Sequence, residues 1–261
     1  MVRNLVAKEI DIGIIGGSGF YNLINIANTT TLRVKTAFGS VDVIKGNLGG
    51  KKIGFITRHG PKHTKPPHKV NYHANALALF LLGAKYVIAT NAVGSLKKEF
   101  PPGSIIIVDQ IIDFTKNRKT TFFDGEFGLT MPDGRVKKGV VHTDVTEPYC
   151  SYLRKKIIES AEKLKLSVFP RGTYICTEGP RFETPAEINF FRMIGGDVVG
   201  MTTVPEAFLF KELEICYASI TVVTNYAAGM QQRVTHKEVI EIFNKRIPDI
   251  VNLITEVIKN L

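Results

Sequence analysis

The sequence lacks the cysteine pattern of a disulfide scaffold or a zinc site. Its three cysteines, Cys150, Cys176 and Cys216, are spread through 261 residues without a CxxC or CxC pair. An odd number at wide spacing favours neither a disulfide framework nor a metal-ligand set. We therefore predict that all three are core or surface thiols and that the protein binds no metal.

Long apolar runs are also missing. The longest strongly apolar run, from Ala74 to Ala84, contains Asn75 and stops at Lys85, well short of the roughly 20 residues that cross a bilayer. The first residues, MVRNLVAKEIDIGIIGG, place charges and glycines where a signal peptide needs an unbroken apolar segment. We expect a cytoplasmic protein with no membrane partner.

Acidic residues are scarcer than basic ones. The chain has 24 Asp plus Glu against 34 Lys plus Arg, a formal charge of +10. Such a charge is compatible with nucleic-acid binding, an anionic small substrate or a basic solvated surface. The lysines are scattered and match no nucleic-acid motif, so we predict no nucleic-acid partner and keep a basic nucleic-acid-binding protein as a distant alternative.

What is present is typical of a globular α/β protein. Apolar residues make up 44% of the chain and charged residues 22%, close to ordinary domains. Short β-branched runs alternate with helical stretches, and several runs are apolar on both faces, which indicates a sheet covered on both sides. With no linker or internal repeat, we predict one domain over residues 1–261. The expected strands are Asp11–Gly17, Lys52–Arg58, Tyr86–Ala92, Ser104–Asp113, Gly172–Glu178, Asp197–Met201 and Ile215–Asn225.

Three capping boxes predict helix starts, at Thr184–Glu187, Thr203–Glu206 and Thr235–Glu238. The last should begin a long C-terminal helix that ends near Asn260 and is bent by Pro248. Between Phe114 and Val140 turn signals predominate, so we predict an irregular excursion there.

Glycines and polar residues follow several of these strands. Gly13–Gly19 could expose backbone amides to an oxyanion, with the Ser18 hydroxyl beside them. It lacks the third glycine of GxGxxG and the acidic residue some twenty positions later, so a dinucleotide oxidoreductase is disfavoured. Arg58–His63 adds a guanidinium and imidazoles suited to phosphate. Thr90–Ser95 is a further strand end of small residues with exposed donors.

The C-terminal half carries groups suited to a heterocycle. Glu178–Thr184 places an aromatic residue beside an acidic one, Gly200–Glu206 ends a strand in a hydroxyl pair, and Thr224–Gly229 places Asn225 after an apolar strand. Because ligands bind at strand ends in open α/β sheets, these segments together predict a pocket for a heterocyclic compound.

These motifs, in this order, resemble the purine nucleoside phosphorylase / 5′-methylthioadenosine phosphorylase family over about Asp11 to Val239. The resemblance implies a single α/β domain with a mixed, distorted sheet flanked by helices, assembled as homotrimers or homohexamers. It also implies phosphorolysis of a purine nucleoside, with inorganic phosphate as co-substrate and no cofactor. The segments concerned are IGIIGGSGFYN, TRHGPKHTKPPHKVNYHAN, TNAVGSL, DQIIDFT, TEPYC, TEGPRFETPAE, GMTTVPEA and CYASITVVTNYAAG.

The resemblance also assigns roles to residues. His63 and Met201 would face the ribose and Phe182 the purine, while His142 would reach into the site of a neighbouring subunit. From the chemistry of glycosidic cleavage, which needs a donor beside the departing base, we select Asn225 as a catalytic residue together with Arg58 and His59. Phosphate would be held by Ser18, Arg58, His59, Asn91, Ala92 and Thr202.

The base is predicted from donor and acceptor patterns. A 6-oxopurine carries a hydrogen on N1, which a Glu183 carboxylate can accept, whereas adenine N1 is itself an acceptor. Asn225 can donate to N7 or O6, and Ala227 cannot accept from a 6-amino group. His236 matches a histidine that 6-oxopurine phosphorylases carry near the 5′-hydroxyl. We predict phosphorolysis of inosine and guanosine in purine salvage, with methylthioadenosine or methylthioinosine phosphorylase as the alternative.

Overall fold

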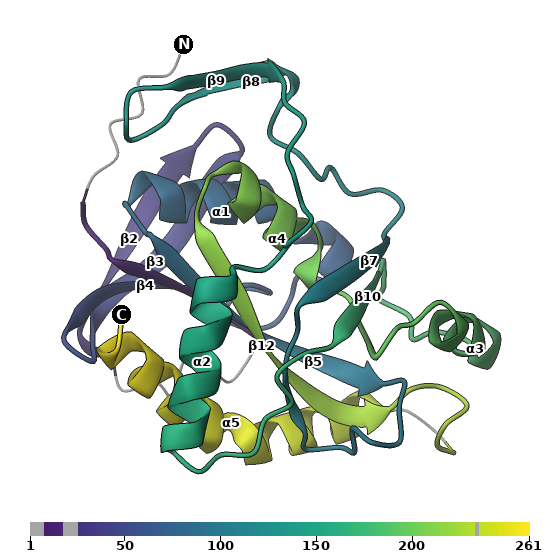
Figure 1. Ribbon diagram of the computed structural model, residues 1–261. Helices are drawn as coiled ribbons and strands as arrows, with labels where there is room; N and C mark the ends of the chain where they lie inside the picture. The colour runs from purple at the N-terminus through teal and green to yellow at the C-terminus, as the bar shows by residue number, and fades with distance from the viewer. Residues whose placement is uncertain (1–7, 18–25, 233–234) are drawn as a thin grey trace.

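A ten-stranded mixed sheet forms the centre of the molecule (Figure 1). The computed structural model describes residues 8–17, 26–232 and 235–261, and in residue 236 the backbone alone. The strand order is β2-β3-β4-β1-β5-β11-β10-β7, and β12 pairs with β5 and β6. The strands are β1 (Ile12–Gly16), β2 (Ala27–Thr36), β3 (Gly39–Leu48), β4 (Lys51–Thr57), β5 (Tyr86–Ser95), β6 (Ile105–Ile107), β7 (Gln110–Phe114), β10 (Thr173–Thr177), β11 (Val198–Gly200) and β12 (Cys216–Tyr226).

Strand β5 organises this sheet. Parallel β12 follows β5 from Tyr86 to Ser95. The other edge of β5 pairs in parallel with β1 over Tyr86–Ala89 and then antiparallel with β11 at Gly94 and Ser95. This change of neighbour along one strand makes the sheet mixed and distorted, so the predicted α/β fold is confirmed.

Helices cover both faces of the sheet (Figure 1). α1 (Tyr72–Leu81) and α4 (Thr203–Glu212) contact each other on one face, and α2 (Ser151–Lys163) and α5 (His236–Lys259) contact each other on the opposite face. α3 (Pro185–Met193) lies to the side, near the ends of β7 and β10. No helix in the described ranges is long and apolar enough to cross a membrane.

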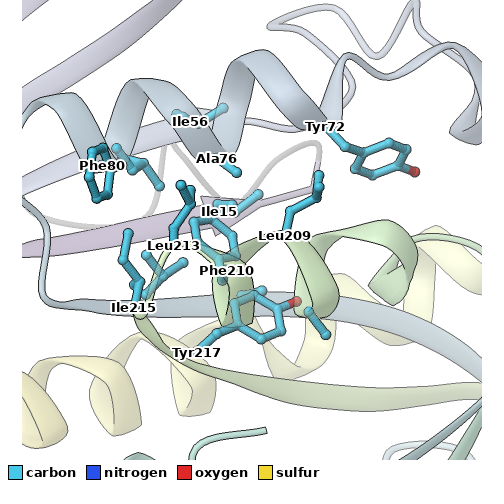
Figure 2. Packing of buried hydrophobic residues seen from close by; sticks show 14 of the residues in the cluster. Ile15, Ile56, Tyr72, Ala76, Phe80, Leu209, Phe210, Leu213, Ile215 and Tyr217 are labelled. Atoms are coloured by element: carbon cyan, nitrogen blue, oxygen red, sulfur yellow. The ribbon is translucent and has the colours of Figure 1, made fainter. Parts of the chain in front are cut away.

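A hydrophobic core lies on each face of the sheet, and successive side chains of β1 point alternately into one core and the other. Ile12 and Ile14 pack with α2 and α5, whereas Ile15 packs with α1 and α4, as Figure 2 shows for Ile15, Phe210 and their neighbours. Gly13 faces α1 so closely that a Cβ would lie 2.7 Å from Leu79 Cδ1. This first glycine of the glycine-rich motif therefore serves helix packing rather than anion binding.

Two of the three predicted helix caps form. Thr184 and Glu187 make a complete capping box before α3, and Thr235 accepts a hydrogen bond from the Glu238 amide at the start of α5. The box predicted at Thr203 is wrong. The Thr203 hydroxyl pairs with Tyr149 Oη at 2.7 Å, and the Glu206 carboxylate binds an arginine instead.

The sequence prediction also missed four strands and merged two. β2 and β3 were not predicted, because many of their residues are exposed and form no apolar run. The segment predicted to be irregular contains a two-stranded hairpin of β8 (Asp124–Thr130) and β9 (Val136–Val140). The run Ser104–Asp113 divides into β6 and β7, because β6 pairs with β12 and β7 with β10.

The prediction for the cysteines is wrong for two of the three. Cys150, the residue before α2, forms a disulfide with Cys216, the first residue of β12, with Cα atoms 5.1 Å apart. Cys176 is a buried free thiol, as predicted. The disulfide ties a helix of one face to the strand that leads into the cavity described below.

Removing this disulfide should destabilise the protein. It closes a loop with a sequence separation of 66 residues, so the Cys150→Ser/Cys216→Ser variant is expected to lose about 2–4 kcal/mol of unfolding free energy. Urea denaturation measures the loss. Dithiothreitol should reproduce it in the wild type and leave the double variant unaffected. A fully reduced wild type with unchanged stability would contradict the prediction.

Candidate active site

A cavity of about 560 Å³ lies where the strands end. β1, β4, β5 and β12 run parallel, so their carboxyl ends meet at one edge, the usual place for a ligand in such sheets. The cavity gathers residues predicted from separate motifs of the sequence. These are Arg58, His59, His63, Asn91, Ala92, Phe182, Glu183, Met201, Thr202, Asn225 and Ala227.

Three predicted site residues do not contribute described side chains to this cavity. Ser18 lies outside the described residues, although Gly17 lines the cavity directly before it. Residue 236 begins α5, but its side chain is also outside the described part. His142 is exposed after the β8–β9 hairpin and does not line the cavity of its own chain.

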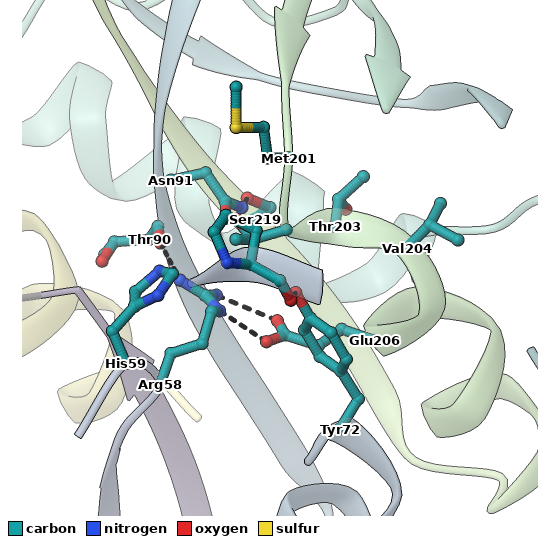
Figure 3. A network of polar contacts seen from close by, with 12 residues as sticks. Arg58, His59, Tyr72, Thr90, Asn91, Met201, Thr203, Val204, Glu206 and Ser219 are labelled. Atoms are coloured by element: carbon teal, nitrogen blue, oxygen red, sulfur yellow. Dashed lines mark hydrogen bonds and ion pairs between the residues drawn. The ribbon is translucent and has the colours of Figure 1, made fainter. Parts of the chain in front are cut away.

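Arg58 places a buried cation in the cavity wall (Figure 3). Its Nε and Nη2 donate to Glu206 at 2.5 and 2.9 Å, and Nη1 donates to the Thr90 carbonyl at 2.8 Å. Burial opposes the charge, but the Glu206 carboxylate outweighs it and raises the Arg58 pKa above its ordinary value. Because guanidinium has five N–H groups, one on each terminal nitrogen remains for an anion.

His59 is a neutral imidazole with a fixed tautomer. Its Nδ1 lies 2.8 Å from the Lys65 carbonyl, which can only accept, so Nδ1 carries the proton. Burial and the Arg58 charge lower the His59 pKa to about 4. The other ring nitrogen is then a bare acceptor near neutral pH, suited to a hydroxyl or to a protonated phosphate oxygen. The His63 ring packs against the His59 ring, with centroids 4.5 Å apart and the planes tilted by 32°.

Asn91 and Thr202 are joined to each other. The Thr202 hydroxyl donates to Asn91 Oδ1 at 2.6 Å, and Asn91 Nδ2 donates to Ser219 Oγ at 2.6 Å. This chain of bonds ties the segment after β11 to strands β5 and β12. Beside it, the buried Thr90 hydroxyl lines the cavity and has no partner among the described residues. Sequence reasoning placed Thr90 in a motif but did not select it as a site residue.

The cavity is also lined by a carboxyl group, that of Glu183, and by a carboxamide, that of Asn225. Burial raises the Glu183 pKa, while a 2.7 Å hydrogen bond from Thr177 Oγ1 limits the rise. A bulge in the β12 pairing between Val223 and Asn225 interrupts the alternation of side chains. Consequently both Thr224 and Asn225 line the cavity.

Hydrogen bonds fix the orientation of the Asn225 carboxamide. Its Oδ1 accepts from the Thr224 hydroxyl at 2.9 Å, and its Nδ2 donates to the Tyr226 carbonyl at 2.8 Å. An amide nitrogen carries two hydrogens, so one remains for a ligand. Asn225 thus offers a donor from a residue that is only 4% exposed.

Helix α5 supplies a wall that the sequence prediction missed. Val239, Ile240, Phe243 and Asn244 line the cavity from one side of the helix, at the i, i+1, i+4 and i+5 spacing of adjacent turns. The sequence predicted this helix from its cap, but a cap does not indicate which side of the helix lines a cavity. In the described ranges, no group of three or more His, Cys, Asp or Glu residues is arranged to hold a metal ion.

The fold and cavity define a class of protein: an α/β enzyme with a cavity at the strand ends that is lined by a buried cation, a carboxyl group and a carboxamide. The chain belongs to the phosphorylase superfamily, whose family model matches residues 11–259. The family predicted from the motifs is therefore confirmed.

Similar proteins include both substrate branches. A 6-oxopurine nucleoside phosphorylase of Pyrococcus furiosus is 52% identical over 93% of this chain and 90% of its own length. An S-methyl-5′-thioadenosine phosphorylase of Hyperthermus butylicus is 42% identical over 97% and 89%. Among solved structures, the methylthioadenosine phosphorylase of Schistosoma mansoni in complex with adenine matches with a TM-score of 0.85 and 31% identity, over 95% of this chain and 90% of that one.

Proposed function

We propose that the protein catalyses phosphorolysis of 6-oxopurine nucleosides. Inorganic phosphate attacks C1′ of inosine or guanosine, the N-glycosidic bond breaks, and free base and ribose 1-phosphate leave. The observation that carries this proposal is the pairing of Glu183 and Asn225 in one cavity with Arg58. Relatives at 47–52% identity named as 6-oxopurine or probable 6-oxopurine nucleoside phosphorylases support it.

Glu183 and Asn225 suit the edge of a keto base. The Glu183 carboxylate would accept from N1–H of hypoxanthine or guanine, and also from the 2-amino group of guanine. The remaining Asn225 N–H would donate to N7 or O6. Adenine would place its N1 lone pair against the carboxylate, at a cost of about 1–3 kcal/mol. Ala227 offers no acceptor for a 6-amino group.

Arg58 and its neighbours suit the phosphate. Breaking the glycosidic bond builds positive charge on the ribose and negative charge on the base, so an anion beside C1′ and a donor beside N7 favour the transition state. We assign the anion site to Arg58, His59, Asn91, Ala92 and Thr202, together with Ser18. His63 and Met201 would face the ribose and Phe182 the base. The reaction needs no cofactor, because phosphate is both nucleophile and counter-charge.

The second candidate is a methylthio-nucleoside phosphorylase. The apolar side chains of Val239, Ile240 and Phe243 line the cavity one to two helical turns after residue 236, the position proposed to meet the 5′-hydroxyl. Such a wall would accept a 5′-methylthio group. Relatives named for S-methyl-5′-thioadenosine and probable S-methyl-5′-thioinosine phosphorylases, at 42% and 44% identity, keep this candidate open.

A substrate panel separates the candidates. With inorganic phosphate, inosine and guanosine should give a higher kcat/KM than adenosine and methylthioadenosine, because Glu183 and Asn225 select the base. Higher values for both adenine nucleosides would refute the proposal. Comparing inosine with methylthioinosine then tests the α5 wall without changing the base, and a preference for methylthioinosine would favour the second candidate.

Assembly and location remain predictions. We propose homotrimers or pairs of trimers in which His142 completes the site of a neighbouring subunit. The exposed position of His142 beside the β8–β9 hairpin, with Val136 and Val140 more than half exposed, supports this arrangement. The cytoplasmic location stays a prediction from the sequence.

A further inference from the structure

Arg118 is a buried arginine that no sequence motif singled out. It lies between β7 and β8, in the segment predicted to be irregular, and its side chain is 3% exposed. It does not line the cavity. Its guanidinium instead binds the backbone of two segments that do.

One set of contacts reaches the segment after β11. Arg118 Nη1 donates to the carbonyls of Met201 and Val204 at 2.7 and 2.6 Å. Between these two carbonyls lies Thr202, which is bonded to Asn91 in the cavity wall. The guanidinium therefore fixes the backbone on both sides of a proposed phosphate ligand.

The second set reaches the segment after β10. Arg118 Nη2 donates to the Glu178 carbonyl at 2.7 Å. The Glu178 carboxylate binds back, accepting from the Lys116 amide at 2.7 Å and pairing with Arg118 Nε at 3.4 Å. This segment continues to Phe182 and Glu183, the residues proposed to meet the base.

Tyr72 connects the Arg118 guanidinium to a third part of the cavity wall, the loop from Arg58 to Pro67. Arg118 Nη1 donates to Tyr72 Oη at 3.3 Å, and the Tyr72 hydroxyl donates to the Pro67 carbonyl at 2.8 Å. Pro67 ends the cavity-lining loop that begins at Arg58. The three walls meet at Gly179, where a Cβ would lie 2.5 Å from Met201 Sδ and 3.5 Å from Pro67 Cγ.

We propose that Arg118 is a positioning residue: it holds the segments after β10 and β11 at the separation at which Glu183 and Thr202 engage one substrate. This inference rests on the proposed function. Backbone carbonyls from the two segments accept hydrogen bonds from the same planar guanidinium. Because its N–H groups have fixed directions, it sets the distance between the two segments. Loss of the fork would let the base end and the phosphate end of the cavity move independently.

The test is Arg118→Met, which keeps most of the side-chain volume and removes the hydrogen bonds. Because misplacement by about 1 Å can cost roughly 10²-fold in rate, we expect kcat/KM for inosine to fall by that order. The fall should lie mainly in kcat, since the ligating groups remain present. Arg118→Lys, which retains charge but not the fork, should recover a part and serves if the methionine variant does not fold.

Arg154 provides a matched control. Its guanidinium also binds backbone carbonyls, those of Val108 and Pro170 at 3.0 and 2.7 Å, but it does so away from the cavity. Arg154→Met should lower stability and leave kcat/KM of the folded enzyme unchanged. Equal losses of kcat/KM in the two methionine variants, or wild-type kinetics in folded Arg118→Met, would overturn the inference.

Hydrogen exchange separates this inference from the proposed function. Arg118→Met should speed amide exchange in residues 178–184 and 201–204, and Arg154→Met should not. A wild type that cleaves no nucleoside would refute the proposed function, and the exchange result would then decide the role of Arg118. Unchanged exchange in Arg118→Met would refute that role.

Discussion

Glu206→Gln is expected to lower the free energy of unfolding by about 3–5 kcal/mol, because it leaves the Arg58 guanidinium buried without a counter-charge. Arg58 and Glu206 have side chains only 2% and 1% exposed. The variant should also raise the KM for phosphate, since the carboxylate orients the fork of Arg58. Chemical denaturation and initial-rate kinetics measure the two effects. Added phosphate should restore part of the lost stability by supplying an anion.

Two controls identify the ion pair as the cause. Glu212→Gln alters another buried carboxyl, one that accepts from the Thr121 hydroxyl and the Phe122 amide rather than from a guanidinium, and should leave the KM for phosphate unchanged. Arg58→Met/Glu206→Leu removes both charges and should recover much of the stability without activity. A Glu206→Gln protein as stable as the wild type would show that Arg58 is not held as described.

Asn225→Ala is expected to reduce kcat for inosine by roughly 10²–10³-fold, the usual cost of losing one transition-state donor. The reason is that Asn225 lines the cavity with one N–H left over, and in the proposed reaction this N–H stabilises the negative charge that develops on the departing purine. Steady-state kinetics at saturating phosphate provide the measurement. Asn244→Ala is the matched control, because it removes an exposed carboxamide from the α5 wall of the same cavity, and its kcat should change little.

Asn225→Asp with Ala227→Asp tests the same contact by reversing it. Carboxyl groups at both positions should shift the ratio of kcat/KM toward adenosine, because they can accept from a 6-amino group. An unchanged ratio, or an Asn225→Ala protein with wild-type kcat, would place the base elsewhere in the cavity.

Local rules of sequence predicted the parts of this fold that depend on neighbouring residues. The caps at Thr184 and Thr235, which begin α3 and α5, were predicted correctly. Each needs only a hydrogen bond between residues three positions apart, which the sequence shows directly. The same rule failed at Thr203, since Tyr149 and Arg58, 54 and 148 residues away along the chain from their partners, took the hydroxyl and the carboxylate. Likewise, β2 and β3 form by pairing with each other, and neither has an apolar run from which the sequence could predict it.

The sequence by itself determined the family, the strand β1 and the strand-end motifs that supply most of the cavity lining, because such motifs come together once the strands run parallel. Only the tertiary structure decided that Glu206 neutralises Arg58, that Cys150 joins Cys216, and that Arg118 spans two cavity segments. Each of these contacts joins residues far apart in the chain. Such contacts depend on the packing of the whole sheet and its helices, which short-range periodicity and capping patterns do not encode.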